Sequence, residues 1–261
     1  MKIKRALVTG SAKRLGREMA LFLAGRGYDV AVHYVASQDA AQETVAEIEA
    51  LGRKSVMLQA DLLIPDQVRD LIPAAMQGLG GPLDLLINNA SIFDYDSIET
   101  MTPESWDRHV GSNLRAPVFL TQAFLESAPR AIPDERGEPV AQSLVVNMID
   151  QRVRKLTPEF FSYTLAKSAL WTFTQTAAQA LAPDVRVNAI APGPTLIGER
   201  QSQNHFAKQR GNTILERGSN ASDIVGALGY LLDAPSVTGQ MLCVDGGQHL
   251  GWRTPDILGM K

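Results

Sequence analysis

The feature that most constrains the fold lies near the N-terminus, where a short apolar stretch runs directly into a glycine-containing turn. The stretch from Lys4 to Thr9 reads as a buried strand, and Gly10 and Gly16 bracket a turn that opens an amphipathic stretch ending at Gly27. Gly10 permits a tight turn, and Gly16 lets helix and strand approach closely. The free N–H groups at the start of such a helix can bind a pyrophosphate. This unit predicts an α/β fold with a dinucleotide site. Because the usual G-x-G-x-x-G spacing is absent, the alternative for the glycine pair taken alone is a simple loop.

Three further apolar segments end in polar or turn residues, which is typical of parallel strands that lead to a ligand site. They run from 83 to 90, from 144 to 150 and from 185 to 193. The hydrophobic periods predict strands near 3–9, 29–34, 54–60, 83–88, 143–149, 185–191 and 240–245, and helices near 15–26, 38–51, 65–79, 103–128, 157–182 and 221–233. We therefore expect one α/β domain over residues 1–261, built on a Rossmann-like, doubly wound parallel sheet.

The composition is that of a globular protein from a reducing compartment. With 261 residues, 45% of them hydrophobic, the chain can bury one large core. Its formal net charge is -3 at pH 7 and its cations are scattered, so we expect no nucleic-acid partner. No apolar run reaches the roughly 20 residues of a membrane helix, and the first one is too short for a signal peptide. Because Cys243 is the single cysteine, no internal disulfide can form, and a cytoplasmic location is the expectation.

Tyr163 and Lys167 are four residues apart in the predicted helix 157–182, so their side chains project from one face. A nearby ammonium favours phenolate over phenol, and we expect it to lower the pKa of Tyr163 from about 10 towards neutrality. The pair then suits general acid catalysis. Asp150, at the end of a predicted strand, adds a carboxyl group. The alternative is an ordinary solvated Tyr–Lys pair on a helix surface.

Taken together, these motifs resemble those of the short-chain dehydrogenase/reductase family over nearly the whole chain. The matching positions, in family order, are Thr9-Gly10 with Gly16, Asn88-Asn89-Ala90, Asn113, Tyr163 with Lys167, Asn188 with Pro192-Gly193, and Val244-Asp245-Gly246-Gly247. Within this family the chain is most similar to the pteridine reductases and the dihydromonapterin reductases. The positions that carry this similarity are Arg14 in place of the usual middle glycine, His33-Tyr34, Asn89 to Phe93, Gly111 to Asn113, and Asp150 in place of the usual serine.

The resemblance implies a reductase that passes a hydride from NADPH to C6 of a 7,8-dihydropterin while N5 takes a proton. The expected catalytic residues are Asn113, Asp150, Tyr163 and Lys167. Tyr163 and Asp150 are the available proton donors and should titrate as a coupled pair. Lys167 would hold the nicotinamide ribose, and Asn113 would fix a water that links Lys167 to solvent. The alternative for Asp150 is a capping role, in which its carboxylate accepts from backbone N–H groups.

The cofactor prediction depends on the end of the second predicted strand. An NAD enzyme usually places an acidic residue there, whereas this chain has no carboxylate between His33 and Ser37. The missing acid and the cations Lys13 and Arg14 favour the 2′-phosphate of NADPH, to which Ser37 could add a hydroxyl. Pteridine reductases carry an arginine at the position of Ala36, so one phosphate contact is absent. The expected cofactor contacts are Gly10, Lys13, Arg14, Leu15, Gly16, His33, Tyr34, Ser37, Asp61, Asn89, Ala90, Ser91, Tyr163, Lys167, Pro192, Gly193 and Thr195.

Phe93 is the residue most informative about the substrate. It follows Asn89-Ala90-Ser91, and the resemblance implies that it sandwiches a flat pterin ring against the cofactor. Offset stacking of two π systems contributes about 1 kcal/mol beyond area burial. The alternative is a core position. The expected substrate contacts are Arg14, Ser91, Phe93, Asp150 and Tyr163.

Two segments fall outside the regular alternation of strands and helices. Residues 195–218 lack a sustained apolar period and lie where the family carries a substrate lid, and residues 131–139 read as a surface loop. The resemblance also implies a homotetramer formed through the helices at 103–128 and 157–182. Two other functions stay open: reduction of an ordinary carbonyl substrate, such as a 3-oxoacyl thioester or a sugar ketone, and a non-catalytic role as an NADPH-binding regulator. No metal site is expected.

Overall fold

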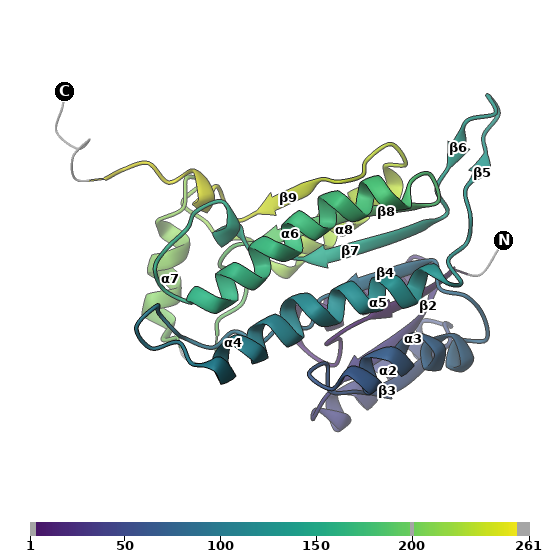
Figure 1. Ribbon diagram of the computed structural model, residues 1–261, viewed down its shortest axis with the longest axis horizontal. Helices are drawn as coiled ribbons and strands as arrows, with labels where there is room; N and C mark the ends of the chain where they lie inside the picture. The colour runs from purple at the N-terminus through teal and green to yellow at the C-terminus, as the bar shows by residue number, and fades with distance from the viewer. Residues whose placement is uncertain (1–3, 199–200, 255–261) are drawn as a thin grey trace.

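Seven strands form one parallel sheet in the computed structural model, which describes residues 4–198 and 201–254 (Figure 1). Their spatial order is β3-β2-β1-β4-β7-β8-β9. The strands are β1 (Lys4–Val8), β2 (Tyr28–Tyr34), β3 (Ser55–Gln59), β4 (Leu85–Asn88), β7 (Ser143–Met148), β8 (Val185–Pro192) and β9 (Met241–Val244). The predicted doubly wound parallel sheet is therefore confirmed. Residue 3 of the first predicted strand, residues 199–200 of the predicted lid and both ends of the predicted domain lie outside the described residues.

Helices cover both faces of this sheet. The helices are α1 (Arg14–Gly25), α2 (Gln38–Ala50), α3 (Pro65–Leu79), α4 (Pro103–Val110), α5 (Ala116–Leu125), α6 (Phe161–Leu181), α7 (Gln203–Gly211) and α8 (Ala221–Asp233). Helices α1, α2 and α8 pack on one face, and α3, α5 and α6 pack on the other. Figure 1 shows α5 and α6 side by side along the near face. Among the described residues, no helix has the length and apolarity to cross a membrane.

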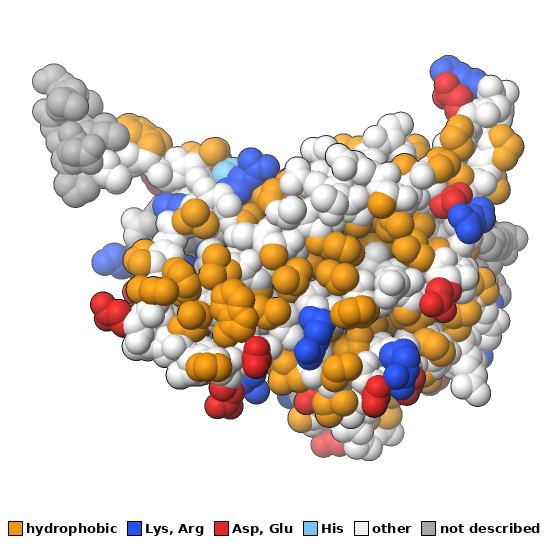
Figure 2. All heavy atoms as spheres, viewed as in Figure 1, with side chains coloured by type: hydrophobic (Ala, Val, Ile, Leu, Met, Phe, Trp, Pro, Cys, Tyr) orange, Lys and Arg blue, Asp and Glu red, His pale blue; other side chains and the backbone are white. Residues whose placement is uncertain are grey.

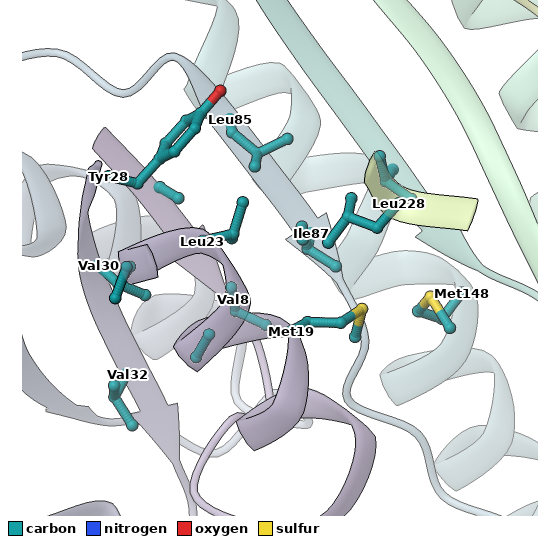
Figure 3. Close-up of a cluster of buried hydrophobic side chains, with 14 of the residues drawn as sticks. Val8, Met19, Leu23, Tyr28, Val30, Val32, Leu85, Ile87, Met148 and Leu228 are labelled. Carbon is teal, nitrogen blue, oxygen red and sulfur yellow. The ribbon is translucent and has the colours of Figure 1, made fainter. Parts of the chain in front are cut away.

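The central strands are apolar on both sides because helices cover both faces of the sheet. Side chains alternate along β1, so Ala6 and Val8 face the cluster under α1 and α8, while Leu7 faces the cluster under α3 and α5. Figure 3 shows the first cluster, in which Met19 of α1 and Leu228 of α8 pack against the strands. This packing fixes α1 on the sheet and so fixes the glycine turn that precedes it.

Two predicted helices differ from the structure next to the predicted catalytic residues. The predicted helix 103–128 consists of α4 and α5 joined by a wide π-helical turn, η1 (Gly111–Arg115). The predicted helix 157–182 begins only at Phe161, because Phe160 adopts a left-handed backbone conformation with a φ of 54°. A residue in that conformation cannot continue a right-handed helix. The chain therefore enters α6 through a sharp change of direction at Phe160.

The segment 131–139 forms a short hairpin rather than the predicted irregular loop. Its strands are β5 (Ile132–Pro133) and β6 (Pro139–Val140), and Figure 1 shows them projecting from the body of the molecule. The turn is closed by Asp134, whose carboxylate accepts from two backbone N–H groups at 2.8 and 2.9 Å. The turn-forming residues that predicted a loop thus close a hairpin.

The order of the strands reverses between β1 and β4, which makes this pair the switch point of the fold. The chain passes from β1 to β2 and β3 on one side, and then returns to β4, β7 and β8 on the other. The carboxyl ends of β1, β4 and β7 therefore lie side by side. They lead into the glycine turn, the amides Asn88-Asn89 and Asp150, and this edge of the sheet holds the candidate site.

Candidate active site

The glycine turn after β1 is held in one shape by close packing and by hydrogen bonds. Gly10 has a φ of +64°, and a Cβ there would lie 3.0 Å from Cα of Ala90. A Cβ on Gly16 would lie 2.2 Å from the carbonyl oxygen of Gly10, so only glycine fits there. Nδ2 of Asn89 donates to the carbonyl of Thr9 at 2.8 Å. The turn is thus fixed against the end of β4, with the start of α1 directly behind it.

His33 supports the same turn from β2. Its Nδ1 accepts from the N–H of Gly10 at 2.9 Å, and its Nε2 lies 2.9 Å from the carbonyl oxygen of Ala60, to which it donates. Burial lowers the pKa of His33 to about 4, which keeps the ring neutral, as an accepting Nδ1 requires. The structure places the side chains of His33 and Tyr34, both predicted cofactor contacts, in the interior. The ring of His33 therefore acts on the backbone of the turn.

A polar hollow of about 300 Å³ opens where the glycine turn meets the start of α2. It is lined by Lys13 and by residues 36–40. Ser37 precedes the helix, and its hydroxyl does not cap the helix backbone. A lysine, a hydroxyl and a helix N-terminus together favour a phosphate group, although the carboxylate of Asp39 at the same hollow opposes it. The structure thus brings together Lys13 and Ser37, two of the three residues predicted to bind the 2′-phosphate, and Arg14 does not line this hollow.

Arg14 is oriented towards a different segment. Its guanidinium donates to the carbonyl oxygens of Leu196 and Ile197, at 3.3 and 2.9 Å. Its backbone has a φ of 56°, a conformation that glycine adopts more readily. Arg14 therefore connects the glycine turn to the first residues of the predicted lid, and its phosphate and substrate contacts stay predictions. Within the lid, α7 has no buried residue, which explains the missing apolar period.

Tyr163, Lys167 and Asp150 meet at the carboxyl end of β7. Tyr163 and Lys167 belong to α6, and both are buried, with 5% of Tyr163 and 2% of Lys167 exposed. Oη of Tyr163 donates to Oδ2 of Asp150 at 3.0 Å, and Nζ of Lys167 donates to the carbonyl of Met148 at 2.8 Å. Oδ1 of Asp150 accepts from the N–H of Arg152 at 2.8 Å. Asp150 therefore caps the turn after β7, as the alternative from the sequence has it, and also accepts from the phenol, while its role as a proton donor stays a prediction.

Burial determines the pKa values of these three groups. The pKa of Tyr163 lies well above its usual value because the phenol is buried and the carboxylate of Asp150 is beside it. The prediction that Lys167 would lower this pKa towards neutrality is therefore wrong. Burial also raises the pKa of Asp150 and lowers the pKa of Lys167 to about 8. Asp150 thus keeps a proton to a higher pH than an ordinary carboxyl, which suits a proton donor.

Asn113 lies in the π-helical turn, where both ends of its amide bond the same residue. Its Oδ1 accepts from the N–H of Ile92 at 2.9 Å, and its Nδ2 donates to the carbonyl of Ile92 at 2.8 Å. These two bonds fix the segment that carries Ser91 and Phe93. Asn113 therefore positions the predicted substrate contacts, and its role in holding a water stays a prediction.

Phe93 belongs to a cluster of aromatic side chains beside the phenol. Its ring stacks on Phe160 with centroids 4.2 Å apart and an interplanar angle of 3°, and it meets Tyr163 edge-on at 4.7 Å. Tyr95 meets Phe160 edge-on at 5.3 Å. Phe93 is 47% exposed and Tyr95 is 54% exposed, which excludes a core position for either ring. An accessible aromatic surface therefore lies next to Tyr163.

A buried polar network fixes the start of α6. Nδ1 of His109 lies 2.7 Å from Oγ of Ser162, whose hydroxyl and N–H both bond the carboxylate of Asp96. The N–H of Asp94 donates to Nε2 of His109 at 3.1 Å, so the ring is neutral with its proton on Nδ1. This network holds the residue before Tyr163 in place. The sequence carries no signal for it, because its members are spread over residues 94–162 without a characteristic spacing.

The remaining predicted cofactor contacts lie around the same edge of the sheet. Asp61 follows β3, and its carboxylate accepts from the backbone N–H two residues further on at 2.9 Å. Pro192 ends β8, Gly193 bonds the end of β9 through its N–H, and Thr195 donates to the carbonyl of Gly193 at 3.1 Å. Leu15 instead packs against the core under α1. In the described part of the chain, no His, Cys, Asp and Glu side chains are grouped so as to hold a metal ion.

Tyr95, Arg152 and Phe160 lie at the aromatic cluster and are not among the site residues predicted from the sequence. The guanidinium carbon of Arg152 lies 4.7 Å from the ring centroid of Phe160, within the aromatic cluster. The available signals are the cationic run that contains Arg152, Arg154 and Lys155, and the paired aromatics Phe160-Phe161. Neither pattern indicates a direction for the side chains, so neither could place them at the site.

Comparison with known sequences yields one family. The family model for short chain dehydrogenase matches residues 4–208. The 3-oxoacyl-[acyl-carrier-protein] reductase FabG of Staphylococcus epidermidis is 30% identical over 252 residues, which cover 95% of this chain and 99% of the relative. The corresponding reductase of Staphylococcus aureus strain Mu50 is 31% identical over 252 residues, covering 95% of this chain and 98% of the relative.

Comparison with solved structures yields reductases that have the same fold. The FolM alternative dihydrofolate reductase 1 of Brucella suis, in complex with NADP, is 44% identical with a TM-score of 0.90, and the match covers 97% of this chain and 98% of that protein. The promiscuous reductase LugOII, which catalyses a keto-reduction in lugdunomycin biosynthesis, is 31% identical with a TM-score of 0.86, covering 95% and 98%. The similar proteins thus include both a dihydrofolate reductase and keto-reductases.

Proposed function

The chain belongs to the short-chain dehydrogenase family, and we propose that it is an NADPH-dependent reductase of 7,8-dihydropterins. The observation that carries this proposal is the 3.0 Å hydrogen bond from Tyr163 to Asp150, next to the exposed ring of Phe93. The resemblance to the family implies a serine at this position in most members and an aspartate in the pteridine reductases, and this chain has Asp150. The 44% identity to an alternative dihydrofolate reductase supports a substrate with a pterin ring.

NADPH fits the residues at the edge of the sheet. Gly10 and Gly16 lack room for a Cβ, which lets the backbone of the turn approach a pyrophosphate closely, and the structural relatives include proteins crystallised with NADP. Lys13 and Ser37 would bind the 2′-phosphate in the hollow at the start of α2. Lys167 would hold the nicotinamide ribose. When bound, NADPH supplies the hydride that C6 of the substrate accepts.

The chain's own residues supply the proton. As C6 gains a hydride, N5 must gain one proton, so that the C=N double bond becomes a C–N single bond. Asp150 and Tyr163 both carry exchangeable protons and are hydrogen-bonded to each other, so either can donate while the other replaces the lost proton. The raised pKa of Asp150 favours its protonated form, which donates to N5. Solvent then restores the proton.

Substitutions of Asp150 and Tyr163 test this assignment. Asp150→Ser should lower kcat/KM for 7,8-dihydrobiopterin by roughly 10²-fold, because it removes the buried acid, while reduction of a simple diketone should fall much less. Tyr163→Phe should reduce both activities strongly. Asp150→Asn keeps the shape of the side chain but has no acidic proton, and it should behave like Asp150→Ser. The rates are measured from the loss of NADPH absorbance.

A matched control is Asp107→Ser, which removes an exposed carboxylate from α4 and should leave both activities unchanged. The pterin proposal is refuted if wild-type protein consumes NADPH when given a 3-oxoacyl thioester but does not consume it when given any dihydropterin. Reduction of an ordinary carbonyl substrate is the second candidate function, and the full-length match to 3-oxoacyl reductases favours it. A non-catalytic role, the third possibility, predicts that the protein turns over no substrate. Any turnover that Tyr163→Phe abolishes would exclude it.

A homotetramer formed through α5 and α6 is part of the proposal. A shallow groove of about 350 Å³ lies between these helices, and Figure 2 shows hydrophobic side chains gathered on this face. Phe119, at the groove, is 51% exposed. Burial of this face against a second copy would remove its apolar surface from water. Light scattering should report four chains, and Phe119→Asp should shift the mass downwards; a monomeric wild-type protein would contradict this.

A further inference from the structure

The side chain of Arg152 places a positive charge next to the candidate site, where it acts on the carboxyl group of Asp150 without a salt bridge to it. Arg152 lies in the short 3₁₀ turn η2 (Gln151–Val153) that follows Asp150, and its backbone is fixed because its N–H bonds Oδ1 of Asp150 at 2.8 Å. One guanidinium nitrogen donates to the hydroxyl of Thr157 at 2.8 Å. A guanidinium has five N–H donors, so most of its capacity is unused. Over residues 4–198 and 201–254, Arg152 forms no ion pair with a carboxylate.

The guanidinium of Arg152 is held over the exposed aromatic cluster. Its central carbon lies 4.7 Å from the ring centroid of Phe160 and 5.9 Å from that of Phe93. Such cation–π contacts orient a guanidinium without neutralising it. Phe93 in turn meets Tyr163 edge-on at 4.7 Å. A flat molecule that reaches Tyr163 along these rings therefore passes directly beside the positive charge.

The surface around Arg152 combines aromatic area with positive charge. Phe93 and Tyr95 are about half exposed, so a second aromatic group of a substrate could cover them. A planar carboxylate matches the fork of a guanidinium and can accept two parallel hydrogen bonds from it. A neutral hydroxylated side chain would use neither the charge nor the fork. The geometry therefore favours a substrate that carries a carboxylate beyond its reacting ring.

From this arrangement we infer that Arg152 is the specificity-determining residue for substrates with a carboxylate-bearing aromatic tail, as in folate-type dihydropterins. This inference rests on the proposed dihydropterin reduction and adds the substrate class. Arg152 does not take part in the transfer of hydride or proton. It binds the far end of the substrate and so affects KM more than kcat.

Paired kinetics on two dihydropterins test the inference. Dihydrofolate carries an aminobenzoyl-glutamate tail with two carboxylates, and 7,8-dihydrobiopterin carries a neutral tail. Arg152→Gln should lower kcat/KM for dihydrofolate at least tenfold relative to that for dihydrobiopterin, mainly through KM. Comparing the ratio removes any effect of the lost charge on Asp150 and Tyr163 that both substrates share. In wild-type protein the KM for dihydrofolate should rise with added salt more than the KM for dihydrobiopterin.

Two further variants separate recognition from folding. Arg152→Lys keeps the charge but loses the planar fork, so it should recover part of the dihydrofolate activity. Arg154→Gln removes an exposed cation two residues away that makes no cation–π contact with Phe93 or Phe160, and it should leave the ratio unchanged. The inference is overturned if Arg152→Gln lowers both activities equally. It is also overturned if dihydrofolate neither reacts with wild-type protein nor competes with dihydrobiopterin. Failure of wild-type protein to reduce either compound would instead refute the proposed function itself.

Discussion

Acidification should destabilise the protein through His33, because its hydrogen bonds require a neutral ring. Nδ1 accepts from the N–H of Gly10 at 2.9 Å, so a proton at this position would break the bond. Burial lowers the pKa of His33 from 6.5 to about 4 in the folded chain. Well above pH 6.5 the ring is neutral in both the folded and the unfolded chain. Between pH 6.5 and about 4 the unfolded chain binds more protons, so stability falls as the pH falls.

The size of this effect follows from the two pKa values. The difference between 6.5 and about 4 corresponds to about 3 kcal/mol at roughly 1.4 kcal/mol per pH unit. About 2 kcal/mol of it should be lost between pH 7 and pH 4.5. His33→Gln removes the titrating group and leaves the N–H of Gly10 and the carbonyl of Ala60 with poorer partners. At pH 7 this variant should be less stable than wild type by about 1 to 3 kcal/mol.

Urea unfolding followed by circular dichroism at pH 7, 5.5 and 4.5 measures the difference directly. Other groups also titrate in this range, but they are common to both proteins and cancel in the comparison. The difference in the free energy of unfolding between wild type and His33→Gln should shrink by about 2 kcal/mol between pH 7 and pH 4.5. His205→Gln, which replaces an exposed histidine of α7, should follow wild type at every pH. If His33→Gln and wild type lose stability in parallel, the buried neutral imidazole is not the cause.

Three further predictions concern cofactor and substrate binding. Gly16→Ala should abolish NADPH binding in calorimetry, because its Cβ would lie 2.2 Å from the carbonyl of Gly10, whereas Gly25→Ala, whose Cβ meets nothing within 4 Å, should bind normally. Wild-type protein should bind NADPH at least tenfold tighter than NADH, about 1.4 kcal/mol, and Lys13→Gln or added salt should reduce that preference; equal affinities at low salt would contradict it. Phe93→Ala should raise the KM for dihydrobiopterin about fivefold, from the loss of about 1 kcal/mol of stacking, and an unchanged KM would exclude Phe93 as a stacking residue.

The fold could be predicted because the signals that define it are local. The central strands β1, β4 and β7 are short apolar runs followed by glycine, amide or acidic residues, as is typical of parallel strands with helices on both faces of the sheet. Tyr163 and Lys167 could also be predicted to share a face, since a spacing of four residues in a helix fixes their relative direction. Asp150 could be placed near them because it follows the strand that precedes this helix in the chain.

The rest of the site depends on burial and backbone conformation, which the sequence does not reveal. The pKa of Tyr163 is raised rather than lowered because groups distant in the chain bury the phenol beside Asp150. Arg152 lies over the ring of Phe160, whose backbone is left-handed, and no residue pattern predicts that conformation. His33 lies in β2 as expected, next to its last residue, but its ring bonds the backbone of Gly10.

The most direct measurement uses NADPH that carries deuterium at the hydrogen it transfers. The deuterium is then followed into a 7,8-dihydropterin. Wild-type protein should form a tetrahydropterin with one deuterium at C6 for each NADPH consumed, as read by mass spectrometry and NMR. Tyr163→Phe should form roughly 10²-fold less of this product. Transfer of the label to a 3-oxoacyl thioester, with every dihydropterin left unlabelled, would contradict the proposed function and leave the family membership unchanged.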